Sequence, residues 1–203
     1  MKVLGITGGI ATGKSIVLEE IGRRGYPTYQ ADVRARALME MLPALREALR
    51  NLLGEMAFTS EGKLDRAYVA QRLFREPELR QQVNGLVHPH TIADFMAWVE
   101  VRRQEGYPAV FKEAALTIEA GAYQGLDGLI VVYAPWPVRI ERLMRRDGLS
   151  HEAALARLQA QMPEWAKLHY ANHVCLNTGR LSIPHLVDTL LEAFSLPLSL
   201  PQG

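Results

Sequence analysis

Cysteine, net charge and long apolar runs are all scarce in this sequence of 203 residues. The 1 cysteine, Cys175, excludes a disulfide within the chain, and its apolar neighbours predict a buried, unreactive thiol. The 23 basic and 22 acidic residues leave a formal charge of +1, so no overall field attracts nucleic acid or an anionic membrane. No apolar run reaches the length of a membrane span, and the first residues resemble a core strand rather than a signal peptide. We expect a cytoplasmic protein without nucleic-acid or membrane partners.

Internal repeats and low-complexity segments are also missing, which disfavours a solenoid or a disordered linker. No Asn-Lys-x-Asp motif occurs, so nothing in the sequence reads a guanine base. What is present is a chain of 48% hydrophobic residues, enough to bury a full core at this length. We expect one core that carries insertions, and the sequence leaves the oligomeric state open.

The most informative stretch runs from Lys2 to Ile16 and predicts a strand, a glycine-rich loop and a helix. Residues 8–15 fit G-x-x-x-x-G-K-[ST], the phosphate-binding P-loop, at every fixed position. Glycines let the backbone N–H groups approach a di- or triphosphate closely, and the helix N-terminus adds positive potential. Lys14 is expected to reach the β- and γ-phosphates, and the Ser15 hydroxyl to bind Mg²⁺.

The rest of the chain predicts an α/β fold with a parallel sheet. Apolar runs of strand length occur near residues 26–30, 109–111, 129–133 and 174–176. Residues 33–106 have helical spacing with breaks near Pro43, Gly54, Gly62, Pro77 and Pro89, which predicts a helical insertion. Residues from Leu196 onward are expected to form a frayed tail.

Asp32 follows the second predicted strand, at the edge where ligands bind in open parallel sheets. Its carboxylate is suited to accept a proton from a substrate hydroxyl or to help hold Mg²⁺. The alternative is a helix N-cap, and the two roles are compatible. Glu113 and Glu119, after the third strand, are weaker candidates for the metal site, and each is nearly as well explained as surface charge.

Arginines form a second group on a helix predicted to start at Pro135 and Pro137. Arg139, Arg142 and Arg146 are spaced to share one helical face, which suits a clamp on phosphate groups. A solvated surface explains the same spacing equally well. His88, before Pro89, is expected to mark a turn and a helix start.

Taken together, these motifs resemble the dephospho-coenzyme A kinase family over nearly the whole chain. The resemblance rests on residues 4–10, Gly13-Lys14-Ser15, Ala31-Asp32, His88-Pro89, residues 142–150, Arg157, Gln161-Met162-Pro163 and Asn177-Thr178-Gly179. It differs from the family pattern at Ala11 and Thr12 (usually Gly and Ser), Ile16 (Thr), Gln30 (Asp), residues 115–119 (a Pro-Leu-Leu-Phe-Glu-like segment) and Arg139 (Gln).

The resemblance implies a P-loop nucleotide-kinase fold of three layers, with a core of residues 1–32 and 107–203. It implies that residues 33–106 bind the acceptor and that a helical lid, about residues 139–167, closes over ATP. The implied reaction is ATP- and Mg²⁺-dependent phosphorylation of the ribose 3′-hydroxyl of dephospho-coenzyme A.

The resemblance also assigns residues to the site. Lys14, Asp32, Arg142 and Arg146 would be catalytic, and Ser15 with Asp32 would hold the metal. The nucleotide would contact Gly8, Gly9, Ala11, Thr12, Gly13, Lys14, Ser15, Ile16 and Asn177. The alternatives are a kinase for another small molecule and a divergent nucleotide-binding protein without kinase activity.

Overall fold

The computed structural model describes residues 1–115, 117–119 and 121–201. Leu116, within the segment 115–119 noted above, lies outside the described residues, as do the last two residues of the expected tail. The chain divides into two compact units, one of Met1–Tyr29 with Val101–Gly203 and the other of Gln30–Glu100. Each unit is described by itself below.

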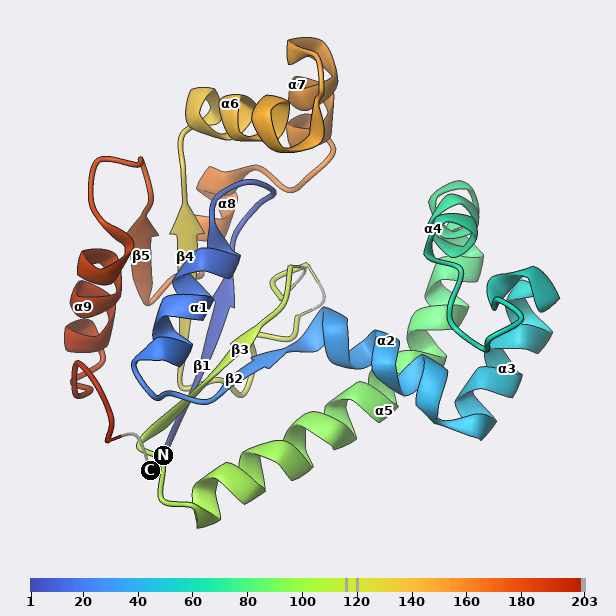
Figure 1. Ribbon diagram of the computed structural model, residues 1–203, viewed down its shortest axis with the longest axis horizontal. Helices are drawn as coiled ribbons and strands as arrows, with labels where there is room; N and C mark the ends of the chain where they lie inside the picture. Colours follow the sequence, from blue (N-terminus) through green and yellow to red (C-terminus); the bar gives the residue numbers. More distant parts are fainter. Residues whose placement is uncertain (116, 120, 202–203) are drawn as a thin grey trace. The chain divides into compact units, whose positions relative to one another are not determined.

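A five-stranded sheet organises the first unit (Figure 1). Its strands are β1 (Lys2–Thr7), β2 (Thr28–Gln30), β3 (Ala109–Glu113), β4 (Gly128–Tyr133) and β5 (His173–Leu176), in the order β2-β3-β1-β4-β5. Strand β1 pairs in parallel with β3 and β4, and β4 pairs in parallel with β5. Because β1 and β4 are central, their residues are almost all buried, as a sheet covered on both faces requires. The α/β prediction is confirmed.

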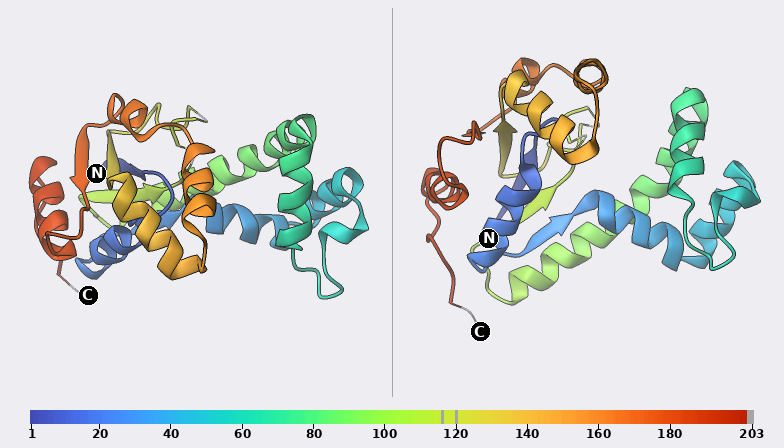
Figure 2. Two further views of the ribbon diagram at one scale, coloured as in Figure 1. Left: turned by 90° about the horizontal axis from the view of Figure 1, so that it is seen from above. Right: turned by 45° about the horizontal axis from the view of Figure 1, so that its top comes forward.

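Helices cover both faces of this sheet. Helices α1 (Lys14–Arg23) and α9 (Ile183–Ala193) pack together on one face, while α8 (Glu164–Leu168) lies on the other (Figure 2). The core on the α1 side joins Leu4 and Ile130 of the sheet to Val17 and Leu190 of the helices. Helices α6 (Trp136–Asp147) and α7 (His151–Gln159) follow β4, with Gly148 ending α6 in a left-handed conformation at φ 65°.

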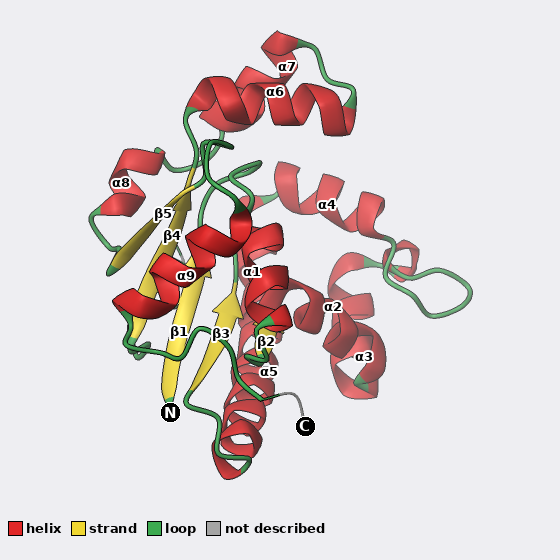
Figure 3. Cartoon of the chain, turned by 60° about the vertical axis from the view of Figure 1, so that its left-hand side comes forward, coloured by secondary structure: helices red, strands yellow, loops and turns green. Residues whose placement is uncertain are grey.

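The second unit is helical, as the spacing of residues 33–106 predicts (Figure 3). It contains α2 (Ala31–Met41), α3 (Pro43–Leu53), the 3₁₀ turn η1 (Glu55–Ala57), α4 (Arg66–Arg75) and most of α5 (Pro77–Gln104). These helices share a hydrophobic cluster of their own, built around Leu45, Leu49 and Leu53 of α3. Among the described helices, none combines the length and the apolar character that crossing a membrane requires.

The predicted break at Pro89 is wrong, and so is the helix start predicted at His88. Helix α5 runs unbroken through both residues. Proline in a helix interior costs about 3 kcal/mol, but each buried apolar side chain returns about 1.5–3 kcal/mol. Leu79, Val83 and Val87, spaced four apart, are all buried on one side of α5 before the proline. Packing therefore outweighs the lost hydrogen bond.

The frayed tail is also a wrong prediction for the residues that the structure describes. Leu196 is buried, the Tyr26 hydroxyl donates to the Pro197 carbonyl at 2.6 Å, and the Leu200 N–H donates to the Arg24 carbonyl at 2.7 Å. The tail is held because these groups lie beyond the end of α1, where free carbonyls and an apolar surface meet it.

Candidate active site

The P-loop connects β1 to α1 in the conformation that its glycines predict. Gly8 has φ 148°, and a Cβ there would overlap the Val132 carbonyl oxygen of β4. Gly13 has φ 95° and caps the N-terminus of α1, so the helix begins where the sequence places it. The Lys14 Nζ donates to the Gly8 carbonyl at 2.8 Å, which holds the lysine head over the loop. The backbone thus forms a cradle suited to phosphate.

Ala11 occupies a strained position in this loop. Its φ of 62° lies in the left-handed region, which costs a non-glycine residue about 1–2 kcal/mol. Next to it, Thr12 is fully buried and its Oγ1 donates to the Gly9 carbonyl at 2.9 Å. Such strain persists only where surrounding contacts fix the backbone, and side chains of α6 supply those contacts.

Arg142, on α6, bridges the P-loop and the end of β5. Its Nη1 donates to the carbonyls of Ala11 at 3.2 Å and Thr12 at 3.1 Å. Its Nη2 donates to Asn177, at 3.2 Å to the backbone oxygen and 3.1 Å to Oδ1. Burial lowers the pKa of Arg142 from its ordinary value, with the neighbouring Arg145 acting in the same direction.

Asn177 completes this bridge from the other side. It follows β5 directly, is 1% exposed, and its Nδ2 donates to the Thr12 carbonyl at 2.9 Å. Its N–H donates to the Tyr133 carbonyl at the end of β4 at 2.8 Å. The sequence places Asn177 at the nucleotide, and the structure places its amide against the P-loop backbone.

Arg139 and Arg146 have different environments, although the spacing predicts one shared face. Arg139 is 1% exposed, and its Nε donates to the Ile10 carbonyl at 2.8 Å. Burial lowers the Arg139 pKa, while the charge of Glu164 opposes that shift. Arg146 instead pairs with Asp147 at 2.7 Å on the exposed side, and its hydrogen bonds hold the Asp147 pKa below the ordinary value. Of the three arginines, Arg139 and Arg142 contact the P-loop in this structure.

A buried ionic cluster lies beside Gly9, and sequence reasoning did not assign it to the site. The Glu164 carboxylate lies 3.6 Å from Arg139 Nη1 and 3.9 Å from Lys167 Nζ. Lys167, 1% exposed, also pairs with Glu119 at 3.1 Å, so Glu119 has an ion-pair partner in place of a surface role. The sequence signal was weak, because α8 carries these charges among Trp165 and other residues typical of any surface helix.

Asp32 lies in the first turn of α2 and is exposed. The helix begins one residue earlier, at Ala31, and the N-cap position belongs to Gln30. The N-cap explanation for Asp32 is therefore wrong, although a carboxylate in the first turn still interacts favourably with the helix dipole. Asp32 belongs to the unit Gln30–Glu100, and its catalytic role stays a prediction.

Ser15 and Ile16 are exposed in the first turn of α1. The Ser15 hydroxyl is open to a ligand at the helix N-terminus, which matches the predicted metal role. At position 16 the exposed fraction is 45%, so an apolar side chain stands on this surface of the loop. Glu113 ends β3 and is half-buried.

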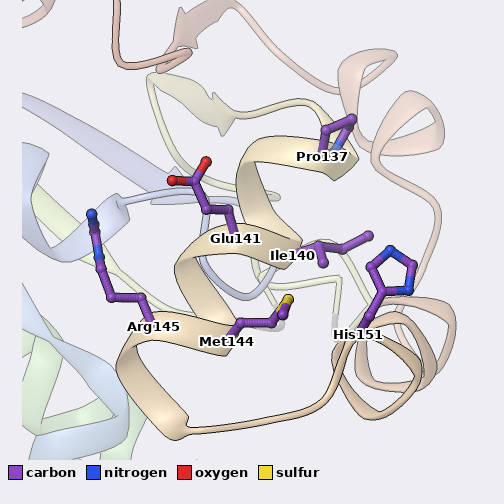
Figure 4. A pocket seen from close by; sticks show the side chains of 6 residues that line it. All are labelled: Pro137, Ile140, Glu141, Met144, Arg145 and His151. Carbon is purple, nitrogen blue, oxygen red and sulfur yellow. The ribbon is translucent and has the colours of Figure 1, made fainter.

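A separate hollow of about 580 Å³ lies over α6 and the start of α7 (Figure 4). Its lining residues are Pro137, Ile140, Glu141, Met144, Arg145 and His151. Those from α6 lie on the opposite side of the helix from Arg139 and Arg142, because 3.6 residues make one turn. None of the six residues belongs to the P-loop, so this hollow is separate from the phosphate cradle.

Comparison with protein families gives a match over residues 2–182 to the model described as dephospho-CoA kinase. The chain belongs to the dephospho-CoA kinase family. A dephospho-CoA kinase of Bacteroides fragilis is 35% identical over 188 residues, which cover 92% of this chain and 90% of the relative. One from Anaeromyxobacter dehalogenans is 39% identical over 180 residues, 88% of this chain and 85% of the relative.

Solved structures agree with the family. A crystal structure of a Thermus thermophilus protein superposes with a TM-score of 0.80 at 36% identity, covering 96% of each chain. The dephospho-CoA kinase of Campylobacter jejuni gives a TM-score of 0.68 at 28% identity, covering 95% of each chain. A shikimate kinase of Bacteroides thetaiotaomicron, at 14% identity and a TM-score of 0.51, shares the P-loop kinase fold alone.

Proposed function

We propose that this chain transfers the γ-phosphoryl group of ATP to the ribose 3′-hydroxyl of dephospho-coenzyme A, giving coenzyme A and ADP. The observation that carries this function is the family match over residues 2–182, which includes the P-loop and the arginines of α6. Dephospho-CoA kinases catalyse the last step of coenzyme A biosynthesis, and the relatives quoted above cover nearly the whole chain. A cytoplasmic location and the lack of a nucleic-acid partner stay predictions from the sequence.

ATP is the phosphoryl donor in this proposal, and residues 8–16 would bind its phosphates. Lys14 would neutralise charge on the β- and γ-phosphates as the bond to the leaving oxygen lengthens. Arg142 would present its guanidinium to the nucleotide from between the P-loop and Asn177. Arg146, paired with exposed Asp147, would have to leave that partner to reach a phosphate.

Mg²⁺ fits the donor chemistry of Ser15 and Asp32. Within the described residues, no group of three His, Cys, Asp or Glu side chains could hold a metal ion. Mg²⁺ commonly takes one or two protein ligands and completes its shell with water and substrate phosphates, so one hydroxyl and one carboxylate suffice. When bound, the ion would neutralise phosphate charge during transfer.

Asp32 is proposed as the general base that receives the proton of the ribose 3′-hydroxyl. A sugar hydroxyl is a poor nucleophile at neutral pH, so a positioned carboxylate increases the rate. Residues 33–106 would hold the acceptor, and residues 139–167 would close over ATP and exclude water.

The Asp32→Asn variant tests this assignment. Asparagine keeps the size of the side chain and removes its charge, so the variant is expected to melt and bind ATP like wild type. Phosphoryl transfer should fall by about 10²–10⁴-fold, the usual contribution of a general base. Activity is measured by coupled ADP release, and melting by circular dichroism.

An acceptor panel tests the substrate. ADP release is measured with dephospho-coenzyme A, adenosine, other nucleosides and pantetheine, at a fixed ATP concentration. Dephospho-coenzyme A should be the preferred acceptor, with product phosphate on the 3′-oxygen. Equal or faster turnover with a compound lacking the pantetheine arm would contradict the proposed substrate. An unchanged rate in Asp32→Asn would instead leave the substrate intact and shift the base to Glu113.

A further inference from the structure

The peptide groups on either side of Ile10, at the tip of the P-loop, are both held by side chains from outside the loop. The Ile10 N–H donates to Gln161 Oε1 at 2.8 Å, and its carbonyl accepts from Arg139 Nε at 2.8 Å. The two side chains also approach each other, with Arg139 Nη2 3.4 Å from Gln161 Oε1. Arg139 comes from α6, and Gln161 from the segment between α7 and α8.

The Ile10 side chain is anchored as well. It packs on a small cluster built from Leu143 of α6 with Ala154 and Leu158 of α7. The N–H, the carbonyl and the side chain of Ile10 therefore all contact residues 139–161. Three contacts on one residue fix its position and its orientation.

This orientation affects the residues that follow. Carbonyls at Ile10, Ala11 and Thr12 accept hydrogen bonds from Arg139 and Arg142. In a phosphate-binding nest, successive N–H groups converge on the anion while the carbonyls point outward. Donors that hold the carbonyls outside the loop keep the N–H groups preorganised for phosphate, which lowers the reorganisation needed at the transition state.

Glu164 keeps Arg139 in place. The guanidinium is buried, and a buried cation without a nearby anion is strongly destabilising. The Glu164 carboxylate, 5% exposed, supplies that charge at 3.6 Å from Nη1. Gly9 leaves the space for this pair, because a Cβ at Gly9 would overlap atoms of both Glu164 and Arg139.

We propose that Arg139 and Gln161 are positioning residues of the phosphoryl transfer, which act through the Ile10 peptide on the P-loop and not by touching the nucleotide. The proposal rests on the proposed function. It assigns the reaction two residues that the P-loop motif does not contain.

Two isosteric variants isolate the hydrogen bond. Glutamine carries an N–H donor at the same number of bonds from Cα as the arginine Nε, and methionine has the same length with no donor. Both are made with Glu164→Gln, so that no carboxylate remains buried without its cation, and Lys167 keeps Glu119 as its partner. The pair Arg139→Gln/Glu164→Gln and Arg139→Met/Glu164→Gln then differs by one donor to Ile10.

The glutamine variant should exceed the methionine variant in kcat by about tenfold, the effect of one lost hydrogen bond. The KM for dephospho-coenzyme A should be equal in the two, and their melting temperatures should agree within about 4 °C. A merely structural role would lower the melting temperature and leave kcat per folded molecule unchanged. Equal kcat values in the two folded variants would overturn the proposal. Arg145→Gln, an exposed charge on the same helix, is the matched control and should match wild type.

Gln161 gives a second test that avoids a buried charge, and it decides the matter if the methionine variant does not fold. Gln161→Ala removes the acceptor of the Ile10 N–H, and Gln161→Glu keeps an oxygen at that position. We expect kcat to fall about tenfold in Gln161→Ala and to recover in Gln161→Glu. Wild-type kcat in Gln161→Ala would refute the clamp. If wild type itself does not phosphorylate dephospho-coenzyme A, the proposed function fails, and MgADP affinity of the same variants still tests the clamp.

Discussion

Arg142 and Arg146 are both candidates for the lid arginine, and replacing each with methionine separates them. Arg142 makes four hydrogen bonds, to three backbone carbonyls and one side-chain oxygen. Arg146 pairs with the adjacent Asp147, and its side chain is 60% exposed. Methionine preserves most of the apolar stem of each side chain, so the comparison measures the guanidinium.

The magnitude for Arg142→Met follows from its partners. Hydrogen bonds from a charged donor contribute about 1.5–3 kcal/mol each, but these four share one guanidinium, and the Thr12 carbonyl keeps Asn177 as a donor. We expect the free energy of unfolding to fall by about 2–3 kcal/mol in total. For a chain of this size that lowers the melting temperature by about 4–12 °C. Arg146→Met should leave the melting temperature nearly unchanged, because exposed ion pairs contribute little.

Activity is read by coupled ADP release, together with ATP affinity by calorimetry. Arg142→Met should lower kcat by at least about tenfold, and more than it lowers ATP affinity, because the guanidinium orders the loop that holds the transferring group. The reasoning is refuted if Arg142→Met melts and turns over like wild type. If Arg146→Met alone loses activity with unchanged melting, Arg146 is the lid arginine. Wild-type behaviour in both would make the arginine group a solvated surface.

The remaining predictions concern Lys14 and Cys175. Lys14→Ala should lower kcat/KM by about 10²-fold or more with little change in melting temperature, because the half-buried lysine acts on phosphate charge; wild-type turnover would contradict the P-loop assignment. Burial raises the pKa of Cys175 to about 11, so at pH 8 about one thiol in a thousand is ionised, against about a quarter in the unfolded chain. A thiol reagent should therefore label Cys175 only when urea unfolds the protein, and rapid labelling of the native enzyme would contradict the burial.

The amino-acid sequence by itself determined the P-loop, the strands of the sheet and the family. Each of these is a local property: glycines at fixed spacing permit the backbone of Gly8 and Gly13, and a continuous apolar run such as Leu129 to Val132 is stable only when buried on both faces. The predicted start of α1 is confirmed for the same reason, since the residues that end a loop and begin a helix are neighbours in the chain.

Only the tertiary structure decided which arginines face the P-loop. Spacing places Arg139, Arg142 and Arg146 on one side of α6, but it does not say what lies opposite that side at each turn. The P-loop carbonyls lie against Arg139 and Arg142, and Asp147 lies beside Arg146. Contacts between residues more than 100 positions apart depend on how the strands order themselves, which no local pattern encodes.

The corrections have the same cause. A proline at position 89 predicts a break from its missing N–H, yet burial of Val83 and Val87 holds α5 together. Polar residues at the C-terminus predict fraying, yet the end of α1 binds the backbone near Leu200. Local preference amounts to a few kcal/mol at most, and packing by distant residues is of the same size, so the folded chain decides between them.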